Sequence, residues 1–233
     1  MPILSLDNVS MSFGALNAIS GVSFHVDHEI LGLIGPNGAG KTTLINCITG
    51  VYKPQGAIML GEENITGIKP HQIFRKGIAR TFQIPRPFLR MTVKDNLLVT
   101  ARNDNEVDEI LSMVGLEKKA CLPAAKLTFP EYRKLEIARA LAGKPKLLLL
   151  DEAISGLNPT ESALMVKLVK NIHVHANVAI LWIEHVMQAV MENATRIIVL
   201  NQGMKLCEGS PEEVAGDAKV IEVYLGKKYM FKE

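Results

Sequence analysis

Hydrophobic and polar residues alternate along the first part of the chain, from Ile3 to Val26. Alternation with a period of two is typical of half-buried strands, and a turn near Gly14 divides this segment into short antiparallel strands. Two further strands are predicted around Ala57–Leu60 and Ile78–Phe82. The chain is therefore expected to begin with an antiparallel β lobe.

Three later runs are apolar throughout: Ile30–Ile34, Leu147–Leu150 and Val178–Ile183. A helical pattern over Glu161–Asn171 separates the last two, and this strand–helix–strand spacing implies parallel strands. The stretch from Asn103 to Ala142 is mostly helical in pattern. We expect an α/β fold in which residues 1–233 form one domain, with a mainly parallel sheet and an inserted helical lobe at about residues 86–142.

A glycine-rich segment lies between the run Ile30–Ile34 and a helical pattern that starts at Lys41. It matches G-x-x-x-x-G-K-[ST] in the strand–helix context that a phosphate-binding loop requires. Its residues are Gly35, Pro36, Asn37, Gly38, Ala39, Gly40, Lys41 and Thr42. Glycines let backbone N–H groups point at phosphate oxygens, and the helix adds the positive end of its dipole. We expect Lys41 to reach the β- and γ-phosphates, Thr42 to ligate Mg²⁺ and Thr43 to contact the α-phosphate. A glycine-rich turn without a ligand is the alternative.

Two carboxylates, Asp151 and Glu152, follow Leu147–Leu150, at the strand end where α/β sheets bind ligands. Asp151 is expected to hold Mg²⁺ through water. Glu152 is expected to polarise the attacking water, because adjacent strand residues point in opposite directions. His185 follows the next apolar run and is expected to reach the γ-phosphate. A solvated turn is the alternative for the acidic pair, and a surface or core residue is the alternative for His185.

Composition narrows the possible functions. The chain has 26 Lys and Arg against 24 Asp and Glu, a net charge of +2, which does not favour nucleic acid as a partner. Cys47, Cys121 and Cys207 show no metal-ligand spacing and are expected to be reduced thiols in the cytosol. The apolar runs fall short of the roughly 20 residues that a membrane helix needs, and the first residues lack the features of a signal peptide. A role at a membrane would therefore require docking onto a membrane-spanning partner.

Taken in order, these motifs resemble the nucleotide-binding domain of ABC transporters over essentially the whole chain. The segments that carry the resemblance are Gly35–Thr43, Gln83, Leu127–Lys134, Leu147–Glu152, Ser155–Asn158 and His185. The resemblance implies a P-loop NTPase core that binds ATP and Mg²⁺, and two such domains that sandwich two ATP molecules head to tail. It also implies that Gln83 contacts Mg²⁺ and links to the transmembrane partner, and that Phe13 stacks on adenine. A core phenylalanine is the alternative for Phe13.

A narrower resemblance is to the ATPases of branched-chain amino-acid importers. It rests on Arg80–Gln83, Leu135–Ala140, Ser155–Pro159, Ile183–Met187 and Val223–Gly226. It implies an ATPase subunit at the cytoplasmic face of the cell membrane, working with transmembrane permease subunits, a second ATPase subunit and, indirectly, a solute-binding protein. Urea or short-amide importers share much of this pattern, and lipopolysaccharide-export ATPases share some. The alternatives are a soluble ABC ATPase outside transport and a catalytically weak partner in a heterodimer.

The family signature is altered in this chain. Thr128, Phe129, Pro130 and Glu131 follow Leu127 where the family has Ser-Gly-Gly-Gln after its leucine. Thr128 keeps a hydroxyl for the opposing nucleotide, but Pro130 has no N–H to offer it. A lost charge-assisted hydrogen bond is worth about 1.5–3 kcal/mol. Proline is tolerated in the first turn of a helix, so the fold is expected to be unaffected.

The segment from Ile84 to Val93 is interrupted by prolines and is not expected to form a regular helix. The segment carries the candidates for partner contact, which are Arg86, Phe88, Leu89 and Arg90. The family resemblance implies that this region lines the groove that receives a short helix of the membrane subunit. A surface loop without a partner is the alternative.

Overall fold

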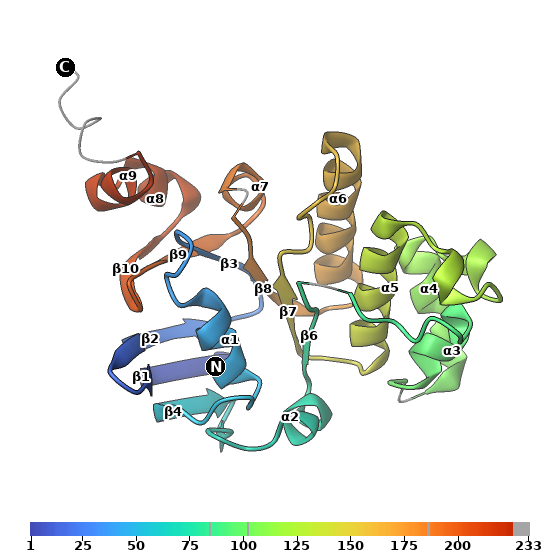
Figure 1. Ribbon diagram of the computed structural model, residues 1–233, viewed down its shortest axis with the longest axis horizontal. Coiled ribbons are helices and arrows are strands. Elements are labelled where there is room, and N and C mark those ends of the chain that lie inside the picture. Colours follow the sequence, from blue (N-terminus) through green and yellow to red (C-terminus); the bar gives the residue numbers. More distant parts are fainter. Residues whose placement is uncertain (84, 102, 186, 226–233) are drawn as a thin grey trace. The chain divides into compact units, whose positions relative to one another are not determined.

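The computed structural model describes residues 1–83, 85–101, 103–185 and 187–225. The chain forms two compact units. The first consists of Met1–Ile73 together with the chain from Ala179 onward, and the second of Phe74–Val178. The helices expected at about residues 86–142 lie within the second unit (Figure 1). That residues 1–233 act as one nucleotide-binding domain stays a prediction.

The first unit begins with an antiparallel sheet. Its strands are β1 (Leu4–Phe13), β2 (Leu16–Val26), β4 (Gln55–Leu60) and β5 (Glu63–Asn64), in the order β2-β1-β4-β5. The alternating apolar side chains of β1 and β2 are buried on one face of the sheet, as the period of two requires. The predicted antiparallel lobe is confirmed.

The same unit carries the parallel strands. Strand β3 (Ile30–Ile34) pairs in parallel with β8 (Ala179–Ile183) and β9 (Arg196–Asn201). Strand β10 (Met204–Gly209) pairs antiparallel with β9. Every residue of β3 and β8 is buried, which explains why both read as continuous apolar runs. The predicted mainly parallel sheet is confirmed for these strands.

Helices cover these strands in the first unit. They are α1 (Lys41–Ile48), α7 (Met187–Met191), α8 (Pro211–Gly216) and α9 (Ala218–Leu225). Helices α8 and α9 contact β10 and lie beside it in Figure 1. A core cluster that includes Ile34, Val199 and Val220 lies beneath them, and Tyr224 packs against it. Helix α2 (Pro70–Lys76) contains the boundary between the units.

The second unit joins a short parallel pair of strands to a group of helices. Strand β6 (Ile78–Arg80) pairs in parallel with β7 (Leu147–Asp151). The helices are α3 (Val93–Leu98), α4 (Val107–Val114), α5 (Phe129–Ala142) and α6 (Pro159–His175). Short 3₁₀ turns lie at Asp104–Glu106, Glu117–Lys119 and Ala124–Lys126. Helix α5 packs against α3 and α4, and in Figure 1 it lies between them and α6.

Three predicted boundaries were wrong. The helix predicted at Glu161–Asn171 continues to His175, because Ile172 is fully buried and extends the apolar face. The strand predicted to reach Phe82 ends at Arg80. The helical region begins at Val93, ten residues before the predicted Asn103, where Thr92 caps the first turn through its contact with Asp95.

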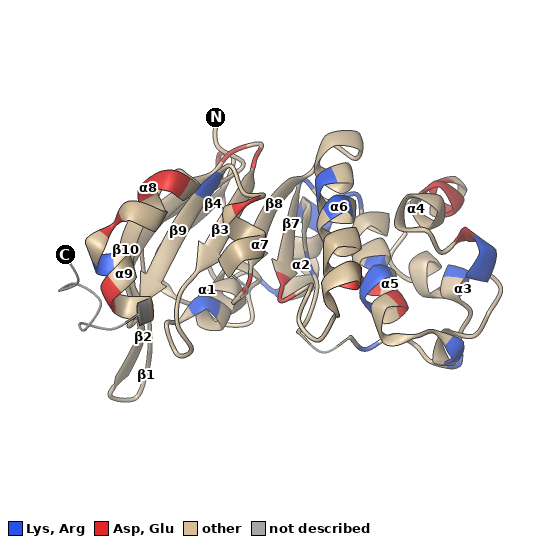
Figure 2. Ribbon diagram, turned by 90° about the horizontal axis from the view of Figure 1, so that it is seen from above, with Lys and Arg blue, Asp and Glu red and all other residues tan. Residues whose placement is uncertain are grey.

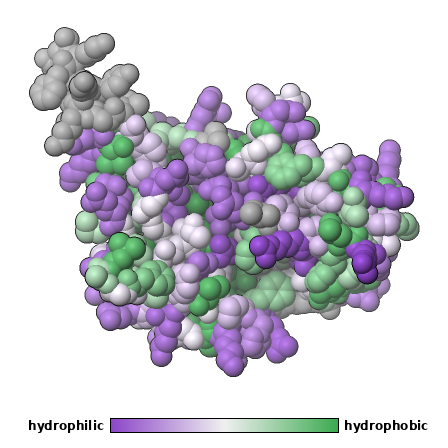
Figure 3. All heavy atoms as spheres, viewed as in Figure 1, coloured by the Kyte–Doolittle hydropathy of each residue, from purple (hydrophilic) through white to green (hydrophobic). Residues whose placement is uncertain are grey.

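The surface of the molecule mixes polar and apolar side chains on the face seen in Figure 3. Within the described part of the chain, the helices are all too short or too polar to cross a bilayer.

Candidate active site

The glycine-rich loop connects β3 to α1 in the first unit, and its shape requires glycine at two positions. A Cβ on Gly35 would lie 2.2 Å from the Leu200 carbonyl oxygen. A Cβ on Gly40, whose φ is 101°, would lie 2.6 Å from the Ala18 carbonyl oxygen. The backbone of the loop is therefore packed closely against neighbouring backbone, which only glycine permits.

Lys41 is buried at the start of α1 and curls back onto the loop. Its Nζ donates to the Gly35 carbonyl oxygen at 2.6 Å and to the Pro36 carbonyl oxygen at 3.0 Å. The ammonium group is thus held by the same loop whose N–H groups are expected to meet phosphate. This contact fixes a positive charge at the place where the motif needs one.

The first turn of α1 is open to an anion. The N-cap is Gly40, and no side chain among the described residues caps this helix start. The first N–H groups of a helix have no partner within the helix and are the groups that donate to an anion bound there. Thr42 is exposed and Thr43 half-buried, so the Thr42 hydroxyl is accessible as an oxygen ligand.

His185 leaves the sheet at the same edge as the glycine-rich loop. Strand β8 is in register with β3, with Ile183 opposite Leu33. Gly35 and His185 therefore each lie two residues beyond a paired position. The His185 side chain is exposed, whereas the intervening Glu184 is fully buried. The histidine is therefore a surface residue at the edge where parallel strands place their functional groups.

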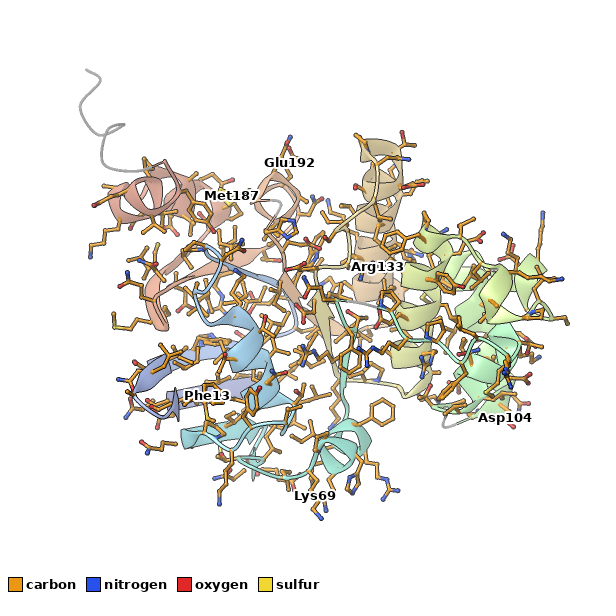
Figure 4. The ribbon with its side chains drawn as sticks, in the orientation of Figure 1. Phe13, Lys69, Asp104, Arg133, Met187 and Glu192 are labelled. Atoms are coloured by element: carbon orange, nitrogen blue, oxygen red, sulfur yellow. The ribbon has the colours of Figure 1, made fainter. Side chains whose placement is uncertain are left out.

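Phe13 ends β1 and is labelled in Figure 4. Its side chain is 42% exposed, which excludes the alternative of a buried core phenylalanine. The ring meets that of Tyr52 edge to face, with centroids 5.1 Å apart. This contact steadies an exposed aromatic face that can stack on a flat ligand.

In the second unit, Asp151 ends β7 and is buried. The Arg80 guanidinium donates to its Oδ2 at 2.8 Å. The Asp151 N–H donates to Thr81 Oγ1 at 3.1 Å. A buried carboxylate needs such a partner, because an unpaired charge is costly away from water. Arg80 was not among the predicted site residues, because no local pattern connects it to Asp151, 71 positions away.

Glu152 adopts a left-handed backbone conformation, with φ 52°. Non-glycine residues rarely adopt positive φ, and those that do are concentrated at functional sites. Gln83 Nε2 donates to Glu152 Oε2 at 2.8 Å. The structure therefore brings Gln83 and the carboxylate expected to polarise water together, although 69 positions separate them in sequence.

The altered signature forms the first turn of α5. Thr128 is the N-cap, and Pro130 lies in the first turn, so the expectation that proline does not disturb the helix is confirmed. The Thr128 N–H donates to Glu131 Oε2 at 3.0 Å, and Lys119 pairs with Glu131. Burial opposes the shift, but these bonds hold the pKa of Glu131 below its ordinary value. Phe129 is exposed beneath the Arg133 guanidinium, 5.1 Å from its ring centroid.

The expected residues are therefore divided between the units. The first unit holds Phe13, the segment Gly35–Thr43 and His185, and the second holds Gln83, Asp151, Glu152 and the signature Thr128–Glu131. Among the described residues, no group of three or more His, Cys, Asp or Glu side chains could hold a metal ion.

Comparisons with known proteins agree with this arrangement. A family model described as ABC transporter matches residues 19–155. A second, described as Branched-chain amino acid ATP-binding cassette transporter, matches residues 204–229. The chain is 40% identical to the high-affinity branched-chain amino acid transport ATP-binding protein LivG of Salmonella typhimurium, over 97% of this chain and 98% of that protein. It is 39% identical to the corresponding protein BraF of Pseudomonas aeruginosa, with the same coverage.

Solved structures show the same likeness. An ATP-binding cassette of an ABC transporter in its ADP conformation superposes with a TM-score of 0.88 and is 31% identical, over 97% of this chain and 100% of that one. A component of an ABC transporter complex from Clostridium perfringens superposes with a TM-score of 0.85 at 25% identity, over 98% of this chain and 97% of that one.

Proposed function

This chain belongs to the ABC transporter family, and from that premise we propose that its ATPase activity drives the import of branched-chain amino acids or similar small solutes. ATP-binding proteins of this family bind ATP and work with transmembrane permease components. The relatives named above transport branched-chain amino acids, and residues 204–229 match the model specific to that group. The observation that carries the proposal is the glycine loop, with Lys41 held against it and an uncapped helix start behind it.

The residues of the first unit would bind the nucleotide. The backbone N–H groups of the glycine loop, of which Pro36 has none, and those of the first turn of α1 would face the phosphates. Lys41 would exchange its two loop carbonyl contacts for phosphate oxygens. Phe13 offers an exposed ring to the adenine. His185, at the same sheet edge, would contact the γ-phosphate.

The residues of both units offer oxygen ligands of the kind that Mg²⁺ prefers. They are the Thr42 hydroxyl, the Gln83 amide oxygen and the Asp151 carboxylate. When bound with ATP, the ion would neutralise phosphate charge. Arg80 orients Asp151 through its 2.8 Å contact. The donor chemistry therefore fits magnesium.

Glu152 would act on the attacking water. A carboxylate within hydrogen-bond reach of that water accepts its proton as the oxygen attacks the γ-phosphate. The amide of Gln83 donates to this carboxylate and holds it in one orientation. The positive φ of Glu152 turns the chain sharply at the end of β7.

We further propose that the chain works at the cytoplasmic face of the membrane with permease subunits, a second ATPase subunit in an ATP sandwich and, indirectly, a solute-binding protein. The near-neutral charge supports a protein partner over nucleic acid. A second candidate function is that of the catalytically weaker partner in a heterodimer. One observation favours this second function. Pro130, in the first turn of α5, has no N–H to donate to the nucleotide bound by the second ATPase subunit.

Two substitutions test the proposal on the full chain. Lys41→Ala should abolish binding of a fluorescent ATP analogue at micromolar concentration, because the phosphates lose their main cation. Glu152→Gln should bind the analogue normally but release phosphate about 100-fold more slowly or worse, since a general base contributes at least that much. Lys170→Ala, the same change at an exposed lysine of α6, is the matched control and should alter neither measurement.

Gel filtration of Glu152→Gln with ATP and Mg²⁺ adds a test of the sandwich. The trapped nucleotide should produce a larger species, alone or with the partner subunit. Phosphate release by Glu152→Gln at the wild-type rate would contradict the hydrolytic role, and unchanged nucleotide binding by Lys41→Ala would contradict the role of the loop.

A further inference from the structure

We propose that Arg133 and Glu136, on α5, are positioning residues that hold Gln83 against Glu152 by fixing the peptide of Phe82. The inference rests on the proposed function, because it takes Gln83 and Glu152 to be part of the hydrolytic site. It goes further by assigning a role to two residues of α5 to which the sequence motifs gave none.

The backbone of Phe82 needs partners outside the sheet. Strand β6 ends at Arg80, and the last backbone contact to β7 is the Thr81 N–H, which donates to the Leu149 carbonyl oxygen at 3.0 Å. Beyond that point the ladder no longer satisfies the polar groups of the chain. Backbone N–H and C=O groups in partly buried surroundings, as those of Phe82 are, need other partners once they leave a sheet.

Helix α5 supplies both partners. The Phe82 N–H donates to Glu136 Oε1 at 2.7 Å. The Phe82 carbonyl oxygen accepts from Arg133 Nη1 at 3.3 Å. Residues three positions apart lie on one face of a helix. A single face of α5 therefore binds both the N–H and the carbonyl oxygen of Phe82, the residue before Gln83. Figure 2 shows that α5 carries charges of both signs.

The two side chains are buried, with Arg133 4% and Glu136 8% exposed. Buried charged groups are costly unless they are paired or hydrogen-bonded. Exposed ion pairs, by contrast, contribute little to stability. Here the two side chains bind the backbone of Phe82, so α5 holds this peptide in place.

Arg133 also holds the loop that carries Glu152. Its Nη2 donates to the Ser155 carbonyl oxygen at 3.2 Å, and the Ser155 N–H donates to the Glu152 carbonyl oxygen at 3.2 Å. Figure 4 labels Arg133 on α5. One guanidinium therefore contacts the peptide before Gln83 and the turn after Glu152.

The consequence concerns the Gln83–Glu152 contact at 2.8 Å. Gln83 is exposed, and an exposed glutamine side chain has up to about 2 kcal/mol of rotamer entropy to lose when it is held in one place. Fixing the Phe82 peptide limits the positions that the Gln83 amide can sample. Small misplacements of such groups lower catalytic rates more than they lower substrate affinity.

A double-mutant cycle separates positioning from general stability. Glu136→Leu removes the acceptor for the Phe82 N–H, whereas Glu136→Gln keeps an amide oxygen there. In the full chain, Glu136→Leu should lower kcat roughly ten-fold while the KM for ATP changes less than about two-fold. Glu136→Gln should retain most of the activity. In a Gln83→Ala background, Glu136→Leu should change kcat less than about two-fold, because its effect passes through Gln83.

Hydrogen exchange gives a second measurement. The Phe82 amide should lose protection in Glu136→Leu and keep it in Glu136→Gln.

An equal loss of kcat in the wild-type and Gln83→Ala backgrounds, or equal losses in Glu136→Leu and Glu136→Gln, would overturn the inference. If Glu136→Leu does not fold, the same cycle with Arg133→Lys decides, since lysine keeps the charge but cannot reach Phe82 and Ser155 together. Normal ATP hydrolysis by Glu152→Gln would contradict the proposed function itself. Independent effects of the Glu136 and Gln83 substitutions would contradict only the positioning role of α5, so the two failures can be told apart.

Discussion

Glu136 is a carboxylate whose surroundings oppose its charge. Burial raises its pKa to about 7, although the Phe82 N–H and the guanidinium groups of Arg133 and Arg139 pull in the other direction, and Asp151 adds to the rise. At neutral pH both protonation states are therefore populated in the folded protein. In the unfolded chain the same group is fully ionised at this pH, because its ordinary value is 4.5.

The difference predicts a pH-dependent stability. A carboxyl whose pKa is raised on folding binds a proton more tightly in the native state, so it favours folding at low pH. The contribution of Glu136 to the free energy of unfolding falls as the pH rises from 4.5 to about 7. Above a pH of about 7 this contribution is lost. Relative to Glu136→Gln, the wild-type free energy of unfolding should fall by about 2–3 kcal/mol between pH 5 and pH 8.

Urea unfolding of both proteins across this range measures the effect. The comparison with Glu136→Gln removes the titration of all other groups, which the two proteins share. A constant difference between the two proteins at every pH would show that Glu136 has the same pKa in both states.

Residues of the site differ in how far sequence alone could identify them. Lys41 and Thr42 are adjacent in a motif, and Asp151 and Glu152 end one apolar run, so local patterns were enough. Arg80 meets Asp151 across 71 positions, and Phe82 meets Glu136 across 54. No periodicity or spacing rule connects residues so far apart, because the contacts depend on how β6, β7 and α5 pack.

At the scale of elements, helix α5 accommodates Pro130 in its first turn without loss of helical structure. The proposed function of this turn, donation of an N–H to a nucleotide, is what the proline affects. The cap of the helix is intact, with the Thr128 N–H bonded to Glu131. Pro130 lies where the first turn needs no intrahelical N–H. In the proposed ATP sandwich, the cost of this proline would fall on the nucleotide of the opposing site. We expect an asymmetric heterodimer in which the site that uses this signature is the weaker one.

Restoring the missing donor tests this expectation. Pro130→Gly and Pro130→Ala both return an N–H to the first turn of α5. Each should raise the ATPase activity of the chain measured alone by several-fold, consistent with a charge-assisted bond of about 1.5–3 kcal/mol. Each should also cost about 0.4–1 kcal/mol of stability, because proline restricts the unfolded chain.

The two variants control for each other. Alanine supplies the N–H without the backbone freedom of glycine, so a gain in both points to the donor itself. Brisk ATP hydrolysis by the unaltered chain, with no change in either variant, would show that Pro130 is harmless and would remove the argument for asymmetry.

Element boundaries were the least predictable part of the fold. Asn171 resembles a helix end, yet Ile172 is buried and α6 continues for four residues beyond that asparagine. The apolar stretch to Phe82 resembles a strand, yet pairing with β7 stops at Arg80. In both cases tertiary packing overrode the local preference. The continuous runs of β3 and β8 were predictable because burial on both faces leaves little choice of residue.

At the scale of the whole molecule, one exposed stretch of the second unit is suited to a partner. Phe88 is 45% and Leu89 50% exposed. The Arg139 guanidinium lies over the Phe88 ring, 4.9 Å from its centroid, and donates to the Arg86 carbonyl oxygen at 3.2 Å. The stretch is thus held in place while its side chains remain accessible, as a docking surface for the proposed permease would require.

Charge reversal of this surface should separate transport from hydrolysis. Arg86→Glu with Arg90→Glu changes two exposed side chains, so the isolated subunit should hydrolyse ATP at nearly the wild-type rate. Solute uptake by the assembled transporter in vesicles should be lost or strongly reduced, because rim charges govern association. The matched control reverses Lys167 and Lys170 on the exposed face of α6.

Uptake that survives the double reversal would argue that this stretch is an ordinary surface loop. A parallel fall in hydrolysis and uptake would point instead to misfolding, which the melting temperature of the variant would reveal. Loss of uptake in the α6 control would show that added negative charge alone is harmful.

The position of β3 in its sheet has a consequence for how the protein is made. Both strands that flank β3 come from beyond residue 178, since β3 pairs with β8 and β9. A ribosome adding about 5–20 residues per second needs on the order of ten seconds or more to supply them after β3 emerges. Until then the sheet from which the glycine loop extends has not formed. ATP therefore cannot assist folding by binding to the loop. During this interval the apolar side chains of β3 depend on chaperones or on transient contacts for protection.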